Sequence, residues 1–326
     1  MKELQRIGVF TSGGDAPGMN AAVRAVVRSS IYYKKEVFGI MQGYEGMIDG
    51  DIHKLSPRSV SNIIQHGGTM LKTARSERFR TEEGRKKARK QLKEHGIEAL
   101  VAIGGDGTFT GLHKLFEEYQ IPSVCIPGTI DNDLGGTDYT IGYDTAINTA
   151  VEAMDKIRDT AISHDRLFFI EVMGRHSGFI AVHSGVAGGA AVIVVPEEKM
   201  TIKDIYDKLM ESGKRNKKSS LVVIAEGSPL GGAHQIADEI SKMTTYFDIK
   251  VTTLGHLQRG GSPTCFDRVL ASKMGIAAVE GLLEGKNDVM VGILNNKIVY
   301  NTFEKTMQFR QKFDAEASRI NKILSI

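Results

Sequence analysis

The sequence repeats one local pattern, in which an apolar run is followed at once by a glycine-rich loop and then by an amphipathic segment. The runs at 7–10, 101–103 and 124–126 each precede such a loop. Short apolar runs bounded by glycine are typical of buried strands, and the amphipathic segments between them are typical of crossover helices. The alternation therefore predicts an α/β protein with mainly parallel sheets. In such folds ligands bind at the carboxyl ends of the strands, where all of these loops lie.

The same alternation of apolar runs and amphipathic segments predicts the strands and helices along the chain. Strands are expected at 7–10, 98–103, 121–126, 167–172, 191–195, 221–225 and 249–254, and helices at 20–30, 108–118, 146–158, 202–211, 235–243 and 268–283. The loop at 138–144 is a candidate domain boundary.

Composition narrows the class of protein. The 326 residues are enough for two domains, and a net charge of +3 gives no argument for a nucleic-acid or membrane partner. No stretch approaches the roughly 20 apolar residues of a membrane helix, and residues 1–6 lack a secretory signal. Cys125 and Cys265 show no metal-binding spacing and are expected to be reduced thiols. We therefore expect a cytoplasmic protein.

The first loop places Gly13 and Gly14 directly after a strand. Because these residues lack a Cβ atom, their N–H groups can approach an anion, and the helix expected from residue 20 adds the positive end of its dipole. The loop matches neither the P-loop pattern nor the G-x-G-x-x-G dinucleotide fingerprint, so the sequence excludes both here.

The second loop, at 104–108, carries an acid among glycines. A polyphosphate can lie against such a backbone, and Asp106 is a candidate ligand for Mg²⁺, which takes few protein carboxylates besides phosphate oxygens. The alternative is that Asp106 merely caps the helix that follows.

The third loop, at 127–133, carries Asp131 and Asp133 two residues apart. In an extended segment the two carboxylates would point the same way, so that one could take a proton while the other holds a metal. Phosphoryl transfer needs an aligned nucleophile, a base, Mg²⁺ and cationic clamps. Arg75 and Arg175 are candidate clamps because each lies beside a turn of small residues, although the alternative for each is an ordinary surface arginine.

Six motifs together resemble the bacterial form of the ATP-dependent 6-phosphofructokinase family, over essentially the whole chain. They occur in the family's order, which makes chance similarity negligible. They are TSGGD at 11–15, GGDGT at 104–108, PGTIDND at 127–133, MGR at 173–175, AEG at 225–227 and GHLQRGGSP at 255–263.

The resemblance implies a fold, a reaction and an assembly. The fold would be two doubly wound α/β domains with the active site in the cleft between them. The nucleotide domain would be 1–142 plus 258–308, and the sugar-phosphate domain 143–257 plus 309–326. The reaction would be ATP plus fructose 6-phosphate giving ADP plus fructose 1,6-bisphosphate, with Mg²⁺ as cofactor, ADP or phosphoenolpyruvate as effector, and a homotetramer as the active form.

The resemblance also implies roles for individual residues. Asp131 would be the general base on the sugar 1-hydroxyl, and Asp106 would hold Mg²⁺ with Asp133 close to it. Gly14, Arg75, Thr129 and Arg175 would stabilise the transferring phosphoryl group. ATP would contact Gly14, Tyr44, Arg75, Ser76, Gly105, Asp106, Gly107 and Thr108. The sugar phosphate would contact Thr129, Ile130, Asp131, Met173, Gly174, Arg175, Glu226, His256, Leu257, Gln258 and Arg259, and Arg166 and Lys250 of a neighbouring subunit.

Two glycines bear on the phosphoryl donor. Pyrophosphate-using relatives carry Asp in place of Gly107 and Lys in place of Gly128, and a carboxylate at 107 would repel the α-phosphate region of ATP. Glycine at both positions favours ATP.

The chain departs from the family pattern in two places. Lys250 replaces the usual Arg. Lysine cannot form the bidentate hydrogen bonds that arginine forms with phosphate, so the replacement predicts weaker binding of fructose 6-phosphate. The effector site differs as well: the family's acidic metal ligand is replaced by Ala191, and an arginine common in the family is replaced by Pro57. We therefore expect weak activation by ADP, with some anion binding retained. The alternative is that these basic residues only coat a subunit contact. The matching effector positions are Arg24, Arg28, Arg158, Gly189, Arg215, Lys217, Lys218 and Ser219, the last replacing the usual His.

The sequence also bears on three alternative functions. A pyrophosphate-dependent phosphofructokinase is disfavoured by Gly107 and Gly128. An NAD or lipid kinase shares the GGDG motif but not the loops at 127–133 and 256–261. A catalytically silent regulatory subunit would have lost Asp131, Asp106 or Arg175, and all three are present.

Overall fold

The computed structural model describes residues 4–214 and 220–325. The chain forms two compact units, and neither is a single stretch of sequence. The first unit comprises Met1–Thr129, Leu134–Asp144 and Arg259–Gln311, and the second comprises Ile130–Asp133, Thr145–Gln258 and Lys312–Ile326.

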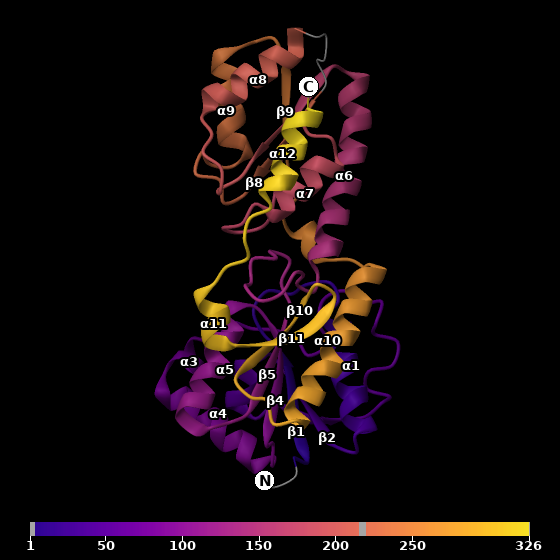
Figure 1. Ribbon diagram of the computed structural model, residues 1–326, viewed down its shortest axis with the longest axis vertical. Helices are drawn as coiled ribbons and strands as arrows, with labels where there is room; N and C mark the ends of the chain where they lie inside the picture. The colour runs from indigo at the N-terminus through magenta and orange to yellow at the C-terminus, as the bar shows by residue number, and fades with distance from the viewer. Residues whose placement is uncertain (1–3, 215–219, 326) are drawn as a thin grey trace. The chain divides into compact units, whose positions relative to one another are not determined.

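The first unit contains a seven-stranded sheet in the order β11-β10-β5-β4-β1-β2-β3. Figure 1 labels β1, β2, β4, β5, β10 and β11 of this sheet. Its five central strands are parallel, while β3 and β11 run antiparallel at the two edges. The central strands are apolar on both faces because helices cover both sides. The strands are β1 (Arg6–Thr11), β2 (Glu36–Ile40), β3 (Ile52–Leu55), β4 (Ala99–Gly104), β5 (Ser123–Pro127), β10 (Val289–Leu294) and β11 (Lys297–Thr302).

Helices pack on each face of this sheet. On one face α1 (Met19–Tyr32) lies along α10 (Cys265–Leu283), and Gly275 permits the approach because a Cβ there would lie 2.6 Å from the Ala25 Cβ. The other face carries a core that includes Phe10, Tyr44 and Phe109. That core is closed by α2 (Tyr44–Asp49), α3 (Glu77–Arg80), α4 (Glu82–Glu94), α5 (Asp106–Tyr119) and α11 (Phe303–Gln308).

The second unit contains a four-stranded parallel sheet in the order β7-β8-β6-β9. Its strands are β6 (Arg166–Val172), β7 (Val192–Val194), β8 (Ser220–Ala225) and β9 (Asp248–Thr253). One face packs against α8 (Ile202–Lys214) and α9 (Ala233–Met243) through an apolar core. The other face carries α7 (Phe179–Ala187) and α12 (Ala315–Leu324), with α6 (Tyr143–Ser163) beside the end of α7, where a Cβ on Gly188 would lie 2.9 Å from the Met154 sulfur.

The predicted class, α/β with mainly parallel sheets, is confirmed. Every predicted strand and helix is present, with ends that differ by a few residues. The elements that the sequence reading missed are α2, α3, α4, α7, α11, α12, β2, β3, β10 and β11. Both cysteines are free, and no helix in the described part of the chain is long and apolar enough to cross a membrane.

Candidate active site

Three glycine-rich loops meet at the carboxyl edge of the first unit's sheet. The Ser12 N–H donates to the Ile103 carbonyl at 3.0 Å, which joins the loop after β1 to β4. The Thr108 hydroxyl donates to the Ser12 carbonyl at 3.3 Å, and the Gly128 N–H donates to the Gly104 carbonyl at 3.0 Å. Hydrogen bonds therefore connect the loops after β1, β4 and β5 into one surface, as the sequence predicts.

The loop after β4 is shaped by two glycines with different surroundings. A Cβ on Gly104 would lie 2.4 Å from the Ser12 carbonyl oxygen and 2.3 Å from the Thr108 Oγ1, so only glycine allows this close approach. A Cβ on Gly107 would meet nothing within 4 Å, so the first turn of α5 borders open space. No side chain caps α5 at Gly105. Uncapped N–H groups at the start of a 14-residue helix are suited to binding an anion.

Asp106 is not the cap of α5. The N-cap is Gly105, and Asp106 is the first helical residue, so the capping alternative does not apply. Its carboxylate forms an ion pair with Arg310, whose Nη1 lies 2.6 Å from Oδ2. The sequence reading did not find Arg310, because the two residues are far apart along the chain.

The donor set fits Mg²⁺ held partly by phosphate. The described residues contain no group of three or more His, Cys, Asp or Glu side chains that could enclose a metal. Mg²⁺ is usually bound by one or two carboxylates and completed by water and substrate phosphates, which is what the partly exposed Asp106 offers. Asp133, the other predicted ligand, belongs to the second unit.

Tyr44 contacts the loop after β4 directly, and Ser76 caps the helix that carries the aromatic neighbour of Tyr44. The Tyr44 hydroxyl donates to the Thr108 carbonyl at 2.6 Å, and its ring stacks on Phe79 with centroids 4.0 Å apart. Tyr44 is only 5% exposed, and burial raises the pKa of its hydroxyl well above the usual 10. The Ser76 hydroxyl caps α3 by accepting the Phe79 N–H at 3.1 Å. These contacts position the loop, while contact with ATP stays a prediction for both residues.

The loop after β1 is contacted by an arginine and a threonine. Arg259 donates from Nη1 to the Asp15 carbonyl at 3.1 Å, and a Cβ on Gly14 would lie 2.5 Å from the same nitrogen. The Thr73 hydroxyl donates to the Gly13 carbonyl at 2.7 Å, which ties the segment before Arg75 to this loop. The exposed Arg75 guanidinium makes no ion pair within the described residues, so it is available to an anion.

In the second unit, the segment 173–175 follows β6 and is held by two acceptors. The Glu226 carboxylate accepts the Gly174 N–H at 3.2 Å and the Arg175 N–H at 2.7 Å, and the Gln258 side-chain oxygen accepts the Met173 N–H at 2.9 Å. Arg175 has a left-handed backbone, with φ of 52°, and its side chain is exposed. Within the second unit the structure therefore brings Met173, Gly174 and Arg175 together with Glu226 and Gln258. His256 and Leu257 are exposed on the turn η1 (Gly255–Arg259) after β9, while the predicted residues Thr129 and Arg259 belong to the first unit.

Asp131 is buried, and the loop around it differs from our expectation. It is 6% exposed, and the Ser177 hydroxyl donates to its backbone carbonyl at 2.8 Å. The segment is not extended, because Asn132 has a φ of 51°. The argument that Asp131 and Asp133 point the same way therefore fails, since alternation of side chains holds only in an extended chain.

Arg166 and Lys250 lie at the opposite edge of the second sheet, at or near the amino ends of β6 and β9. Both contact Asp248, which the sequence reading missed: Arg166 Nε lies 3.0 Å from Oδ2 and Lys250 Nζ lies 2.7 Å from Oδ1. The hydrogen bonds from Lys250 and Arg166 lower the pKa of the Asp248 carboxyl below its usual value. Within one chain, Arg166 and Lys250 therefore do not lie together with Glu226 and Arg175, which follow the carboxyl ends of β8 and β6.

The predicted effector residues are only partly described. Arg24 and Arg28 lie on α1 in the first unit, and Arg158 lies on α6 in the second. The Arg158 guanidinium donates to the carbonyls of Gly188 and, at 3.1 Å, Gly189. Arg215, Lys217, Lys218 and Ser219 lie outside the described residues.

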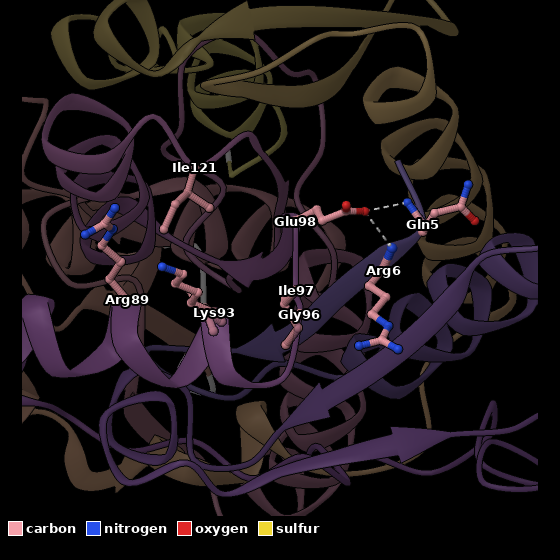
Figure 2. Close-up of a pocket in the computed structure, with 9 residues that line it drawn as sticks. Gln5, Arg6, Arg89, Lys93, Gly96, Ile97, Glu98 and Ile121 are labelled. Atoms are coloured by element: carbon pink, nitrogen blue, oxygen red, sulfur yellow. Dashed lines mark hydrogen bonds between the residues drawn. The ribbon is translucent and has the colours of Figure 1, made fainter. Parts of the chain in front are cut away.

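A pocket of about 500 Å³ lies at the amino ends of the first unit's strands, away from the glycine-rich loops (Figure 2). Glu98 turns toward the start of β1 there and accepts the N–H groups of Gln5 and Arg6 at 2.6 and 3.2 Å. Arg89 and Lys93 line it from α4. None of the predicted site residues borders this pocket.

The fold and these loops define an α/β protein suited to binding phosphates at the carboxyl edge of its sheet. Residues 6–282 match the phosphofructokinase family model. ATP-dependent 6-phosphofructokinase 1 of Thermus thermophilus is 55% identical, with 99% of this chain and 100% of that protein covered. The ATP-dependent 6-phosphofructokinase of Cytophaga hutchinsonii is 53% identical, with 96% and 95% covered.

Solved structures agree with this result. The phosphofructokinase of Saccharomyces cerevisiae is 35% identical with a TM-score of 0.87, over 99% of this chain and 48% of that chain. The pyrophosphate-dependent phosphofructokinase of Marinobacter aquaeolei is 22% identical with a TM-score of 0.84, over 96% of this chain and 86% of that chain, and shares the fold alone.

The chain belongs to the phosphofructokinase family. The prediction of a kinase of the ATP-dependent 6-phosphofructokinase type is thereby confirmed.

Proposed function

We propose that this chain transfers a phosphoryl group from Mg-ATP to the 1-hydroxyl of D-fructose 6-phosphate, giving fructose 1,6-bisphosphate and ADP in the cytoplasm. The observation that carries the proposal is the hydrogen-bonded convergence of three glycine-rich loops beside the uncapped start of α5. We assign nucleotide binding to the first unit and sugar-phosphate binding to the second.

In the first unit, backbone N–H groups and cations hold the phosphates. The first turn of α5 and Gly14 offer N–H groups, and Arg75 offers an exposed guanidinium. Thr129 follows β5, and its N–H donates to the Ile141 carbonyl at 3.1 Å, which fixes the loop that carries the hydroxyl. Asp106 would hold Mg²⁺, which when bound neutralises charge on the phosphate oxygens.

In the second unit, Asp131 is the general base. It takes the proton of the sugar 1-hydroxyl as that oxygen bonds to the γ-phosphorus and the bond to ADP breaks. Because the transition state is loose, proton transfer can come late and the pKa of Asp131 need not be raised far. Arg175 then stabilises the charge on the transferring group, held in place by the two hydrogen bonds from its segment to Glu226.

The geometry of β6 favours a shared site between subunits. Arg166 begins this seven-residue strand and Met173 follows its end, which separates them by about 20 Å at the usual rise per residue. One phosphate cannot contact both, so Arg166 and Lys250 would serve the sugar phosphate of a neighbouring subunit. The active form would be a homotetramer.

We further propose that the effector site binds anions but responds weakly to ADP. Arg158 is committed to the carbonyls of Gly188 and Gly189, and Ala191 offers no carboxylate for the metal of Mg-ADP. Saturation curves for fructose 6-phosphate with and without Mg-ADP test this, and a strong shift to lower substrate concentration would contradict it.

A coupled assay tests the main proposal against its alternatives. Wild-type protein is expected to turn over ATP with fructose 6-phosphate and to be poor with pyrophosphate, because glycine at 107 leaves open space where relatives that use pyrophosphate place a carboxylate. Asp131→Ser is expected to lower kcat by at least about 100-fold, the usual share of a general base.

Asp238→Ser, an exposed change on α9, is the matched control and should retain wild-type turnover. Comparable turnover in wild type and Asp131→Ser would remove the general-base assignment. Turnover with pyrophosphate but not ATP would favour the pyrophosphate-dependent alternative, and no turnover with either donor would favour a regulatory subunit.

A further inference from the structure

We propose that Arg310 is a built-in competitor of the metal at Asp106 and thereby sets how much free divalent cation the enzyme needs to bind its nucleotide. The inference rests on the proposed function, because it concerns the same nucleotide site. It assigns a role to a residue that lies outside every motif found in the sequence.

The contact itself is direct. Arg310 Nη1 lies 2.6 Å from Asp106 Oδ2, within the first unit. The Asp106 side chain is 36% exposed and the Arg310 side chain 58% exposed, so both groups remain in contact with water. Exposed ion pairs of this kind are weak, which means that a divalent cation can displace the guanidinium.

The backbone that carries Arg310 is fixed, although its side chain is long. Arg310 forms an antiparallel bridge with Leu134. A Cβ on Gly135 would lie 2.3 Å from the Phe309 carbonyl oxygen, and Gln311 donates from Nε2 to the Asp138 carbonyl at 3.1 Å. Contacts on both sides of Arg310 thus hold its Cα in place, so the guanidinium is delivered to Asp106 without dependence on a mobile loop.

The two cations cannot share the carboxylate without cost. Mg²⁺ would coordinate a carboxylate oxygen at about 2.0–2.1 Å, and a guanidinium on the same group would then face a doubly charged neighbour. A guanidinium on Asp106 therefore opposes metal binding at the same carboxylate. In the absence of metal, Arg310 neutralises the carboxylate, which reduces the repulsion that Asp106 would exert on a metal-free nucleotide.

This competition predicts effects of opposite sign. Removing the guanidinium should tighten metal binding and weaken binding of the metal-free nucleotide. A residue that merely supports the loop would, when removed, weaken both. The two effects together therefore separate competition from a structural role.

The test uses the full chain saturated with a non-hydrolysable ATP analogue. Free Mn²⁺ is measured by electron paramagnetic resonance, and binding of the analogue in chelator is measured by calorimetry. Arg310→Gln is expected to bind Mn²⁺ about two- to fivefold more tightly, the range of fold-changes that corresponds to exposed ion pairs, and to bind the metal-free analogue several-fold more weakly. Arg310→Lys should fall between it and wild type.

Arg319→Gln is the matched control, because the Arg319 side chain is as exposed as that of Arg310 and forms an ion pair with Glu316 on α12, with atoms 2.7 Å apart. It should match wild type in both titrations. Unchanged or weaker Mn²⁺ binding by Arg310→Gln would overturn the inference. The proposed function is tested separately, by turnover of the wild-type protein with ATP and fructose 6-phosphate. If the Mn²⁺ result contradicts the inference but this turnover is present, only the role of Arg310 is refuted. If this turnover is absent, the proposed function is refuted whatever the Mn²⁺ result.

Discussion

Replacing Gly227 with alanine should impair use of the sugar phosphate while leaving nucleotide binding intact. A Cβ at this position would lie 1.9 Å from the Arg175 carbonyl oxygen, 3.0 Å from its carbonyl carbon and 3.3 Å from the His176 Cα. All three atoms are backbone atoms, so no side chain can rotate away to make room. The backbone that presents Arg175 must therefore move.

The size of the effect follows from that geometry. The contact to the carbonyl oxygen must lengthen from 1.9 Å to at least 3.0 Å, the closest approach that real Cβ atoms show. Since Glu226 accepts the N–H groups of Gly174 and Arg175, which directly precede the Arg175 carbonyl, the shift also strains both of those hydrogen bonds. Misplacing a positioning group by about 1 Å can cost about 100-fold, so we expect kcat/KM for fructose 6-phosphate to fall roughly 100-fold.

The assay measures steady-state rates of wild type and Gly227→Ala against both substrates, together with thermal unfolding. The dissociation constant of the ATP analogue is the internal control, because the nucleotide loops belong to the first unit and Gly227 to the second. A folded variant with unchanged kcat/KM for fructose 6-phosphate would refute the reasoning, since it would show that the segment relaxes without displacing Arg175.

Three other substitutions test separate parts of the site. Gly107→Asp should weaken ATP binding by about 100-fold, as expected for like charges about 6 Å apart at an effective dielectric constant of ~20. Gly107→Asn is the neutral control, and equal KM values for ATP in the two variants would exclude the electrostatic cause. Lys250→Arg should lower KM for fructose 6-phosphate, because a guanidinium grips phosphate at two points; an unchanged KM would contradict this. Ser177→Ala removes the 2.8 Å hydrogen bond to the Asp131 carbonyl and should cost about 1 kcal/mol of stability, visible as a lower melting temperature, with wild-type melting as the opposing result.

The sequence predicted those buried elements that consist of consecutive apolar residues. The run at 101–103 identifies β4, because a strand covered on both faces needs apolar side chains throughout. The charged helix α4 was missed, since only Gly84, Ala88 and Leu92 on it are buried. The edge strand β11 was missed as well, because none of its residues is buried and its short apolar run, 298–300, is not followed by a glycine-rich loop.

Motifs located the site loops but not the contacts between distant segments. Asp248 and Arg310 were missed because ion pairs between residues far apart in the chain leave no local pattern. The expectation that Asp131 and Asp133 point the same way assumed an extended segment, and that premise is wrong because Asn132 has a left-handed backbone. Local sequence thus locates the loops and proposes their residues, while tertiary contacts determine how the side chains of those residues are arranged.

The interrupted course of the chain has a consequence for its synthesis. Strand β5 ends at residue 127, but its partner β10 begins only at residue 289, and all four strands of the second unit come between them. At about 5–20 residues per second, the ribosome leaves the β5 edge without its neighbour for roughly 10 to 30 s. The four strands of the second sheet are all made before the first sheet has its last two. During that interval an open strand edge is exposed to other nascent chains, which makes truncation or a translational pause before residue 289 a route to aggregation.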